Sequence, residues 1–136
     1  MKRATPPTTL DYRLRVTPFL DEREQRYKTR FILETTQSFA SFVYELTVRE
    51  LVDGNNIHLK VQGLKPPRLT IPSAGHAKFE REYDHLNGTC EVTLESIDGR
   101  INAFTLHVAP GNIQLLHAPH EKFAELILET PLKPIP

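Results

Sequence analysis

Cys90-Glu-Val-Thr-Leu94 and Phe104-Thr-Leu-His-Val108 form the stretch that decides the fold, because apolar and polar residues alternate strictly in both runs. Successive side chains of an extended strand point to opposite faces, so this alternation predicts strands with one buried and one solvated face. The same pattern recurs earlier, in Phe42-Val-Tyr-Glu-Leu-Thr-Val48 and in Ile57-His-Leu-Lys-Val61. The chain is therefore predicted to be all-β and to form an antiparallel β-sandwich.

The turn between the first two runs decides their register. A two-residue turn at Asp98-Gly99 would place Phe104 opposite Thr93, which sets an apolar residue against a polar one. A three-residue loop over 97–99, with the glycine in the left-handed region, places Phe104 opposite Val92 instead. We therefore predict the three-residue loop.

A second hairpin is predicted around the Asp-Gly-Asn-Asn turn at 53–56. Pairing Val52 with Ile57 across this turn matches the apolar faces of both strands. The same register sets Glu50 opposite Leu59, a mismatch that an edge position or a β-bulge would accommodate.

Further strands are predicted on both sides of these hairpins. They cover 12–17, ended by Pro18; 27–34; 39–51; 69–71, after a break at 64–67 and closed by Pro72; 78–83; 113–116; and 123–129, whose spacing also fits a helix. The expected organisation is a flexible lead over 1–9, a single β-sandwich domain over 10–130 and a Pro-rich tail over 131–136.

Composition excludes several classes of protein. The chain has 136 residues, the size of one ordinary domain, and its 17 basic residues balance 17 acidic ones. This balance argues against broad attraction to nucleic acid or to an anionic membrane. Cys90 is the only cysteine, so no intrachain disulfide is expected. Neither a secretory signal nor a membrane-spanning apolar run is visible, and the default expectation is a cytoplasmic location.

The stretch from Phe42 to about Leu94 resembles the immunoglobulin-like domain that ends FixG-type proteins. The likeness consists of Val43-Tyr44-Glu-Leu46-Thr-Val48, Val61-Gln62-Gly63-Leu64, Leu69-Thr-Ile71-Pro72-Ser-Ala-Gly75, the alternating segment 78–83 and Cys90–Leu94. The resemblance implies an antiparallel immunoglobulin-like β-sandwich of roughly seven to nine strands. It implies no redox role, because the iron–sulfur motifs and membrane spans of FixG-type proteins lie outside that domain and have no counterpart in this sequence.

His117-Ala-Pro-His120 has the most metal-like spacing in the chain. Two imidazoles three residues apart can converge on a metal ion, and Glu121 could supply a carboxylate. Two histidines beside a proline in a polar segment also fit an ordinary solvated loop. We favour the loop and predict no metal and no cofactor.

Cys90 and His107 are a possible nucleophile and base. In the three-residue-loop register, however, Cys90 points inward opposite Leu106, and His107 points to the other face. The pattern therefore favours a buried structural thiol.

Acid–base groups also gather along one segment, where His76 lies near Glu80 and Tyr83-Asp84-His85 is followed by Asn87. Adjacent strand residues face opposite ways, and no nucleophile stands at a sharp turn, so we expect no catalytic site. An exposed aromatic flanked by Asn, Asp or Arg is typical of carbohydrate sites. The stretch 83–87 is the nearest candidate for one.

Two further groups need an interpretation. The segment that holds the basic residues Arg23, Arg26, Lys28 and Arg30 also holds Glu22 and Glu24, which favours a mixed-charge surface over a cationic patch. The aromatic residues Phe39, Phe42 and Tyr44 straddle both faces of their predicted strand, and one of them exposed beside an open sheet edge would mark a partner site.

The sequence thus predicts a non-catalytic protein-protein interaction or assembly module. It would bind a protein partner through a sheet edge or the loops at one end, with no nucleic acid and no membrane insertion. A carbohydrate- or small-ligand-binding sandwich is the alternative, and a His-based metal protein is a weaker one. A homodimer through an edge strand also stays open.

Overall fold

A computed structural model describes residues 11–39, 45–65 and 75–129 of the chain, and these residues form nine strands and no helix. The strands are β1 (Tyr12–Asp21), β2 (Arg26–Phe39), β3 (Glu45–Asp53), β4 (Asn56–Lys65), β5 (Gly75–Tyr83), β6 (Gly88–Glu95), β7 (Ile101–Ala109), β8 (Asn112–His117) and β9 (Ala124–Leu128). The all-β prediction is confirmed. The last strand is β9 and not the helix that its spacing also allowed.

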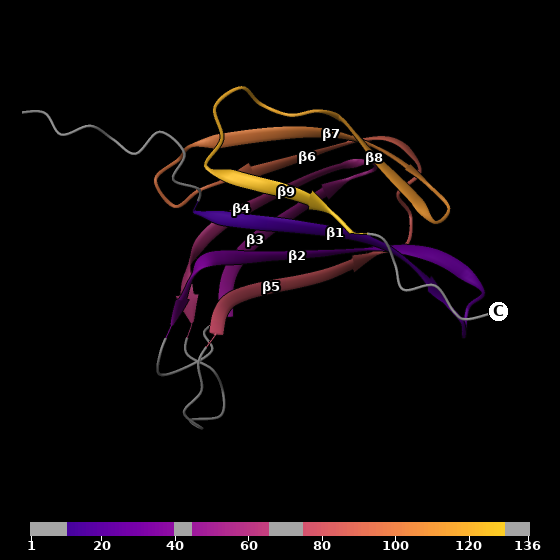
Figure 1. Cartoon of the computed structure of the whole chain (residues 1–136), viewed down its shortest axis with the longest axis horizontal. Coiled ribbons are helices and arrows are strands. Elements are labelled where there is room, and N and C mark those ends of the chain that lie inside the picture. The colour runs from indigo at the N-terminus through magenta and orange to yellow at the C-terminus, as the bar shows by residue number, and fades with distance from the viewer. Residues whose placement is uncertain (1–10, 40–44, 66–74, 130–136) are drawn as a thin grey trace, which may run out of the picture.

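The strands pair in one curled, barrel-like sheet with the order β8-β7-β6-β4-β3-β5-β2-β1-β9 (Figure 1). Its two edge strands, β8 and β9, approach each other, so that the sheet is nearly closed. Three neighbouring pairs run parallel: β1 with β9, β3 with β5, and β4 with β6. The expectation of antiparallel neighbours throughout is wrong for these pairs, because alternation sets the face of each residue but not the direction of a distant partner strand.

One residue pair joins the two halves of this sheet. β3 and β5 pair only where Glu45 lies beside Lys78, and no further pairs follow among the described residues. On one side of this junction lie β8, β7, β6, β4 and β3, and on the other β5, β2, β1 and β9. The junction therefore leaves most of β3 and of β5 with one open edge.

The inward faces of both halves form one hydrophobic core. Alternate residues of β1, β4, β6 and β7 are buried, as the sequence pattern predicted. Phe31 and Phe104 are the largest of the fully buried side chains. The core holds aliphatic and aromatic side chains from every strand, including Leu14, Val16, Leu33, Leu59, Val61, Val92, Leu94 and Leu106.

Both hairpin registers are confirmed. Phe104 lies opposite Val92, and the loop over 97–99 closes with a hydrogen bond of 2.9 Å from the Ser96 amide to the Arg100 carbonyl oxygen. Gly99 has a φ of 90°, which a residue with a side chain rarely adopts.

In the other hairpin, Val52 pairs with Ile57 and Glu50 lies opposite Leu59. The register shift in this pair lies between Thr47 and Val48 and not at Glu50, so the mismatch is accommodated by the edge position and not by a β-bulge.

Pro18 does not end β1, in contrast to the prediction. The carbonyl oxygen of Val16 accepts a hydrogen bond of 2.9 Å from the Glu129 amide, so the main-chain groups of alternate residues here point toward the β9 side. The β1–β9 pairing stops at Val16. The nitrogen of Pro18 therefore points to a side on which no described strand pairs with it, so its missing N–H removes no hydrogen bond of the described sheet.

Other boundaries also differ from the predictions. β2 extends to Phe39, and β4 runs through the break expected at Leu64 as far as Lys65. The predicted lead over 1–9, the strand over 69–71, the tail over 131–136, and Phe42 and Tyr44 lie outside the described residues.

Candidate functional site

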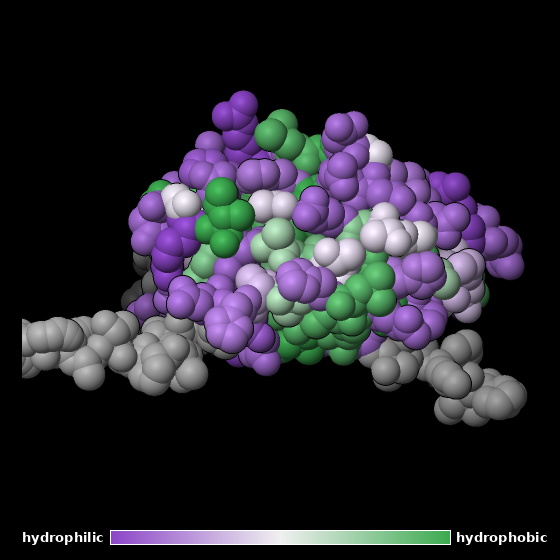
Figure 2. Space-filling view, turned by 90° about the horizontal axis from the view of Figure 1, so that it is seen from above, coloured by the Kyte–Doolittle hydropathy of each residue, from purple (hydrophilic) through white to green (hydrophobic). Residues whose placement is uncertain are grey.

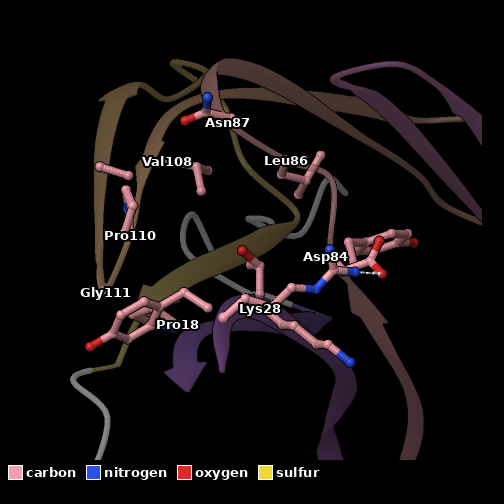
Figure 3. A pocket seen from close by; sticks show the side chains of 13 residues that line it. Pro18, Lys28, Asp84, Leu86, Asn87, Val108, Pro110 and Gly111 are labelled. Carbon is pink, nitrogen blue, oxygen red and sulfur yellow. Dashed lines mark hydrogen bonds and ion pairs between the residues drawn. The ribbon is translucent and has the colours of Figure 1, made fainter. Parts of the chain in front are cut away.

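A cavity of about 370 Å³ opens at one end of the molecule, where four chain segments meet (Figure 3). Its lining comes from Pro18 of β1, residues 26–29 of β2, Tyr83 at the end of β5 with Asp84, Leu86 and Asn87 after it, and residues 108–111 at the β7–β8 turn. Figure 3 shows Asn87, Leu86 and Val108 on one side of this space and Pro18 and Lys28 on the other. The cavity therefore lies between the two halves of the sheet.

The β7–β8 turn shapes one wall of the cavity. Pro110 presets a turn, and Gly111 follows with a φ of 71°, the combination typical of a type II turn. A Cβ on Gly111 would lie 3.1 Å from the Tyr27 ring, so this ring packs directly on the glycine backbone. Tyr27 is still 45% exposed, which leaves part of the aromatic ring open to solvent. Tyr27 thus supplies an accessible aromatic surface.

The cationic side chains at the cavity are neutralised by carboxylates. Lys28 lies 2.8 Å from Asp21 and 3.5 Å from Glu24, and the hydrogen bond to Asp21 raises the pKa of Lys28. The same hydrogen bond is the main cause that lowers the pKa of Asp21. Arg26 lies 3.1 Å from Glu24 and also forms an ion pair with Asp84.

Arg30, farther along β2, pairs with acidic residues of β5. Its Nη2 lies 3.0 Å from Glu82 and its Nε 3.5 Å from Glu80. This arrangement agrees with the prediction of a mixed-charge surface around Arg23, Arg26, Lys28 and Arg30.

The structure brings together part of the segment predicted as a carbohydrate-type candidate. Tyr83, Asp84 and Asn87 line the cavity, whereas the His85 ring points away and lies 2.7 Å from the carbonyl oxygen of Gly54. Glu80 is exposed and pairs with Arg30, and the side chain of His76 is outside the described part of the chain. Tyr27 was missed as a lining residue, because in the predicted strand over 27–34 it shares a face with Thr29 and Phe31, which are buried.

Tyr83 connects the cavity to the open junction of the sheet. Its side chain is buried against Phe31, and its hydroxyl donates a hydrogen bond to Glu50 of β3. Arg81 donates a second hydrogen bond to Glu50, at 3.1 Å. Burial and the hydrogen bond to Glu50 raise the pKa of Tyr83 well above its usual range. In the sequence, the only sign of the contact between Glu50 of β3 and Tyr83 of β5 was that the predicted register set the charged Glu50 opposite the apolar Leu59.

Tyr83 makes stability depend on pH at the alkaline end. Because the pKa of Tyr83 is raised in the folded protein, its contribution is complete below the unfolded pKa and is lost as pH rises beyond it. We expect the free energy of unfolding of the wild type to fall above pH about 10, by up to ~1.4 kcal/mol per pH unit more than that of Tyr83→Phe. Denaturant titrations of both proteins between neutral and strongly alkaline pH measure this difference. Parallel pH profiles for the two proteins would contradict it.

Cys90 is fully buried opposite Leu106, and burial raises the pKa of its thiol. His107 pairs opposite Thr89 and therefore projects from the other face of the sheet. The predicted separation of this thiol from this imidazole is confirmed. A thiol in this setting packs as a small apolar side chain.

His117, His120 and Glu121 are all exposed at the end of β8 and in the segment after it. Among the described residues, no group of three or more His, Cys, Asp or Glu side chains is placed to hold a metal ion.

In the described part of the chain, β8 is an edge strand whose free side faces β9 where the sheet nearly closes. Its six residues include no charged residue and no proline. A register shift against β7 follows Leu115, and Leu115 and Leu116 are 39% and 55% exposed. Edge strands of soluble proteins usually carry charges, proline or a twist that discourages pairing with other chains.

The other open edges are charged. β3 carries Arg49 and Glu50, β5 carries four charged residues over 78–82, and β9 carries Glu125. Figure 2 views the molecule from the β7 side and shows apolar surface gathered along its lower edge, among mostly polar surface. β8 therefore differs from these edges in having no charged residue.

No helix of the described residues is both long enough and apolar enough to cross a membrane. Comparison with protein-family models, with curated proteins and with solved structures finds no match for this chain.

Proposed function

We propose that the protein is a non-catalytic protein-protein interaction module that binds a partner through the outer edge of β8. The observation that carries this proposal is the uncharged edge with two adjacent exposed leucines, Leu115 and Leu116. The partner contributes an extended segment that pairs with the free main-chain groups of β8. A second copy of this chain is one partner that could supply such a segment.

The chemistry of the edge supports this mode of binding. Main-chain hydrogen bonds to an added strand supply affinity without regard to sequence, and apolar anchors in pockets add specificity. Leu115 and Leu116 both expose apolar area, because the register shift against β7 falls between Leu115 and His117. On the partner, we expect apolar side chains at the positions that face this pair.

We also propose an immunoglobulin-like relationship for the architecture. It is supported by the pairing of β3 with β5, which among the described residues is limited to Glu45 with Lys78, and by the core that the two halves of the sheet share. Without that pair, the strands would form two packed sheets of five and four strands.

Leu116→Lys tests the binding proposal, because it places a charge on the edge where a partner strand must pack. Leu51→Lys is a matched control, since Leu51 of β3 is also a 55% exposed leucine. We expect Leu116→Lys to weaken partner binding at least about tenfold, the effect of losing one buried leucine contact. Leu51→Lys should bind like the wild type. Affinity capture with quantitative mass spectrometry, and sedimentation for self-association, measure the difference.

Both variants should remain folded, because each change lies on the surface and should alter stability by less than about 0.5 kcal/mol. Thermal unfolding checks this. The proposal is wrong if folded Leu116→Lys retains the same partners and the same oligomeric state as the wild type, or if both variants lose them equally.

A further inference from the structure

We propose that the cavity between Tyr27 and Asn87 is a second binding site, specific for an uncharged, hydroxyl-rich ring of the saccharide class. This inference does not depend on the β8 edge. It is carried by three features of the cavity: an accessible aromatic ring, polar groups on the opposite side, and cations that are already paired with carboxylates.

The ring of Tyr27 is supported on one side by the β7–β8 turn. Tyr27 packs on the backbone of Gly111, where a Cβ would lie 3.1 Å from the ring, and 45% of the residue stays exposed. Leu86 and Val108 add apolar surface on the other side of the same space (Figure 3). The apolar C–H face of a sugar ring matches such a surface, because aromatic side chains offer large contact area at low entropic cost.

Polar groups lie on the other side of the cavity. The amide side chain of Asn87 forms no hydrogen bond with any other described residue, and its donors and acceptor are available to a ligand. Asp84 is held by Arg26, which orients its carboxylate at the rim. An amide and a fixed carboxylate can each bind neighbouring hydroxyl groups. In small-molecule sites, a small number of well-placed polar groups fixes the orientation of the ligand in this way.

The carboxylates that pair with the cations at the cavity disfavour an anionic ligand. The cations Arg26 and Lys28 are matched by three carboxylates, those of Asp21, Glu24 and Asp84. A phosphate would have to displace these partners and would meet their negative charge. The cavity volume of about 370 Å³ is in the range of small-ligand sites. A neutral polar ring is therefore the ligand class that this lining fits.

Amide NMR spectra of the full chain, recorded during titration with sugars, test the proposal. The six sugars are glucose, galactose, N-acetylglucosamine, cellobiose, lactose and chitobiose. At least one sugar should shift the amides of Tyr27, Asn87 and Gly111, with a Kd on the order of 1 mM. Tyr27→Ala should weaken that binding about tenfold, whereas Tyr27→Phe, which keeps the ring, should stay within about threefold. Leu20→Ala is the control, because Leu20 pairs beside Tyr27, is also exposed, and does not line the cavity.

Inorganic phosphate is titrated in parallel. Shifts at these amides with phosphate and with no sugar would overturn the proposal, and so would the absence of localised shifts with all six sugars. Sugar binding that is equally strong in folded Tyr27→Ala would also overturn it.

Discussion

Replacement of Phe104 by alanine should lower the free energy of unfolding by about 3–5 kcal/mol, the usual cost of a large cavity in a packed core. Phe104 is 1% exposed and lies opposite Val92 in the centre of the β6–β7 pair. Its ring is one of the two largest fully buried side chains, and the surrounding strands can close the space only in part. Urea unfolding measures the change.

Ile101→Ala is the matched control on the same strand. Ile101 is 58% exposed, so its truncation should cost less than about 1 kcal/mol. Equal losses for Phe104→Ala and Ile101→Ala would contradict the placement of the core.

Asn102→Ala should cost about 3 kcal/mol, although Asn102 is a polar residue. It is 3% exposed, and its Oδ1 accepts hydrogen bonds from the amides of Phe123, at 2.9 Å, and Ala124, at 3.3 Å. Its Nδ2 donates to the carbonyl oxygen of Glu121 at 3.0 Å. Alanine leaves two buried main-chain amides without an acceptor, and each unsatisfied group costs on the order of 1–3 kcal/mol.

These hydrogen bonds hold the start of β9 against β7, so the loss should also appear locally. Amide hydrogen exchange in β9 should accelerate in Asn102→Ala, whereas Asn56→Ala, at an exposed asparagine, should leave both stability and exchange unchanged. If Asn102→Ala is as stable as Asn56→Ala, Asn102 does not support this strand.

The hairpins could be predicted from the sequence because each depends on local signals. The alternation around Cys90 and Phe104 allowed only one turn length that buried both apolar faces, and Gly99 could adopt the φ that this turn needs. The parallel pairing of β1 with β9 joins segments more than a hundred residues apart. No local pattern encodes such a partner, and the mixed character of the sheet was therefore missed.

Only the part of the candidate cavity that a short segment of the sequence supplies could be predicted. Asp84 and Asn87 stood out as polar residues beside an aromatic one in a short segment, and they do line the cavity. Tyr27 shares a strand face with core residues but lies at the start of β2, where it stays partly exposed and packs on the distant turn at Gly111. Glu50 likewise reaches Tyr83 across a junction that the sequence does not reveal.

Amide hydrogen exchange of the wild-type protein, measured free and in complex with its partner, tests the central claim most directly. The partner is one that Leu116→Lys no longer binds and Leu51→Lys still binds. In the free protein, outward amides of β8 should exchange faster than those of the central strands β4 and β6, which pair on both sides. In the complex, we predict that protection rises over Asn112–His117, because the partner strand occupies these groups. Unchanged exchange over β8 in the complex, with protection gained at another edge instead, would contradict the account.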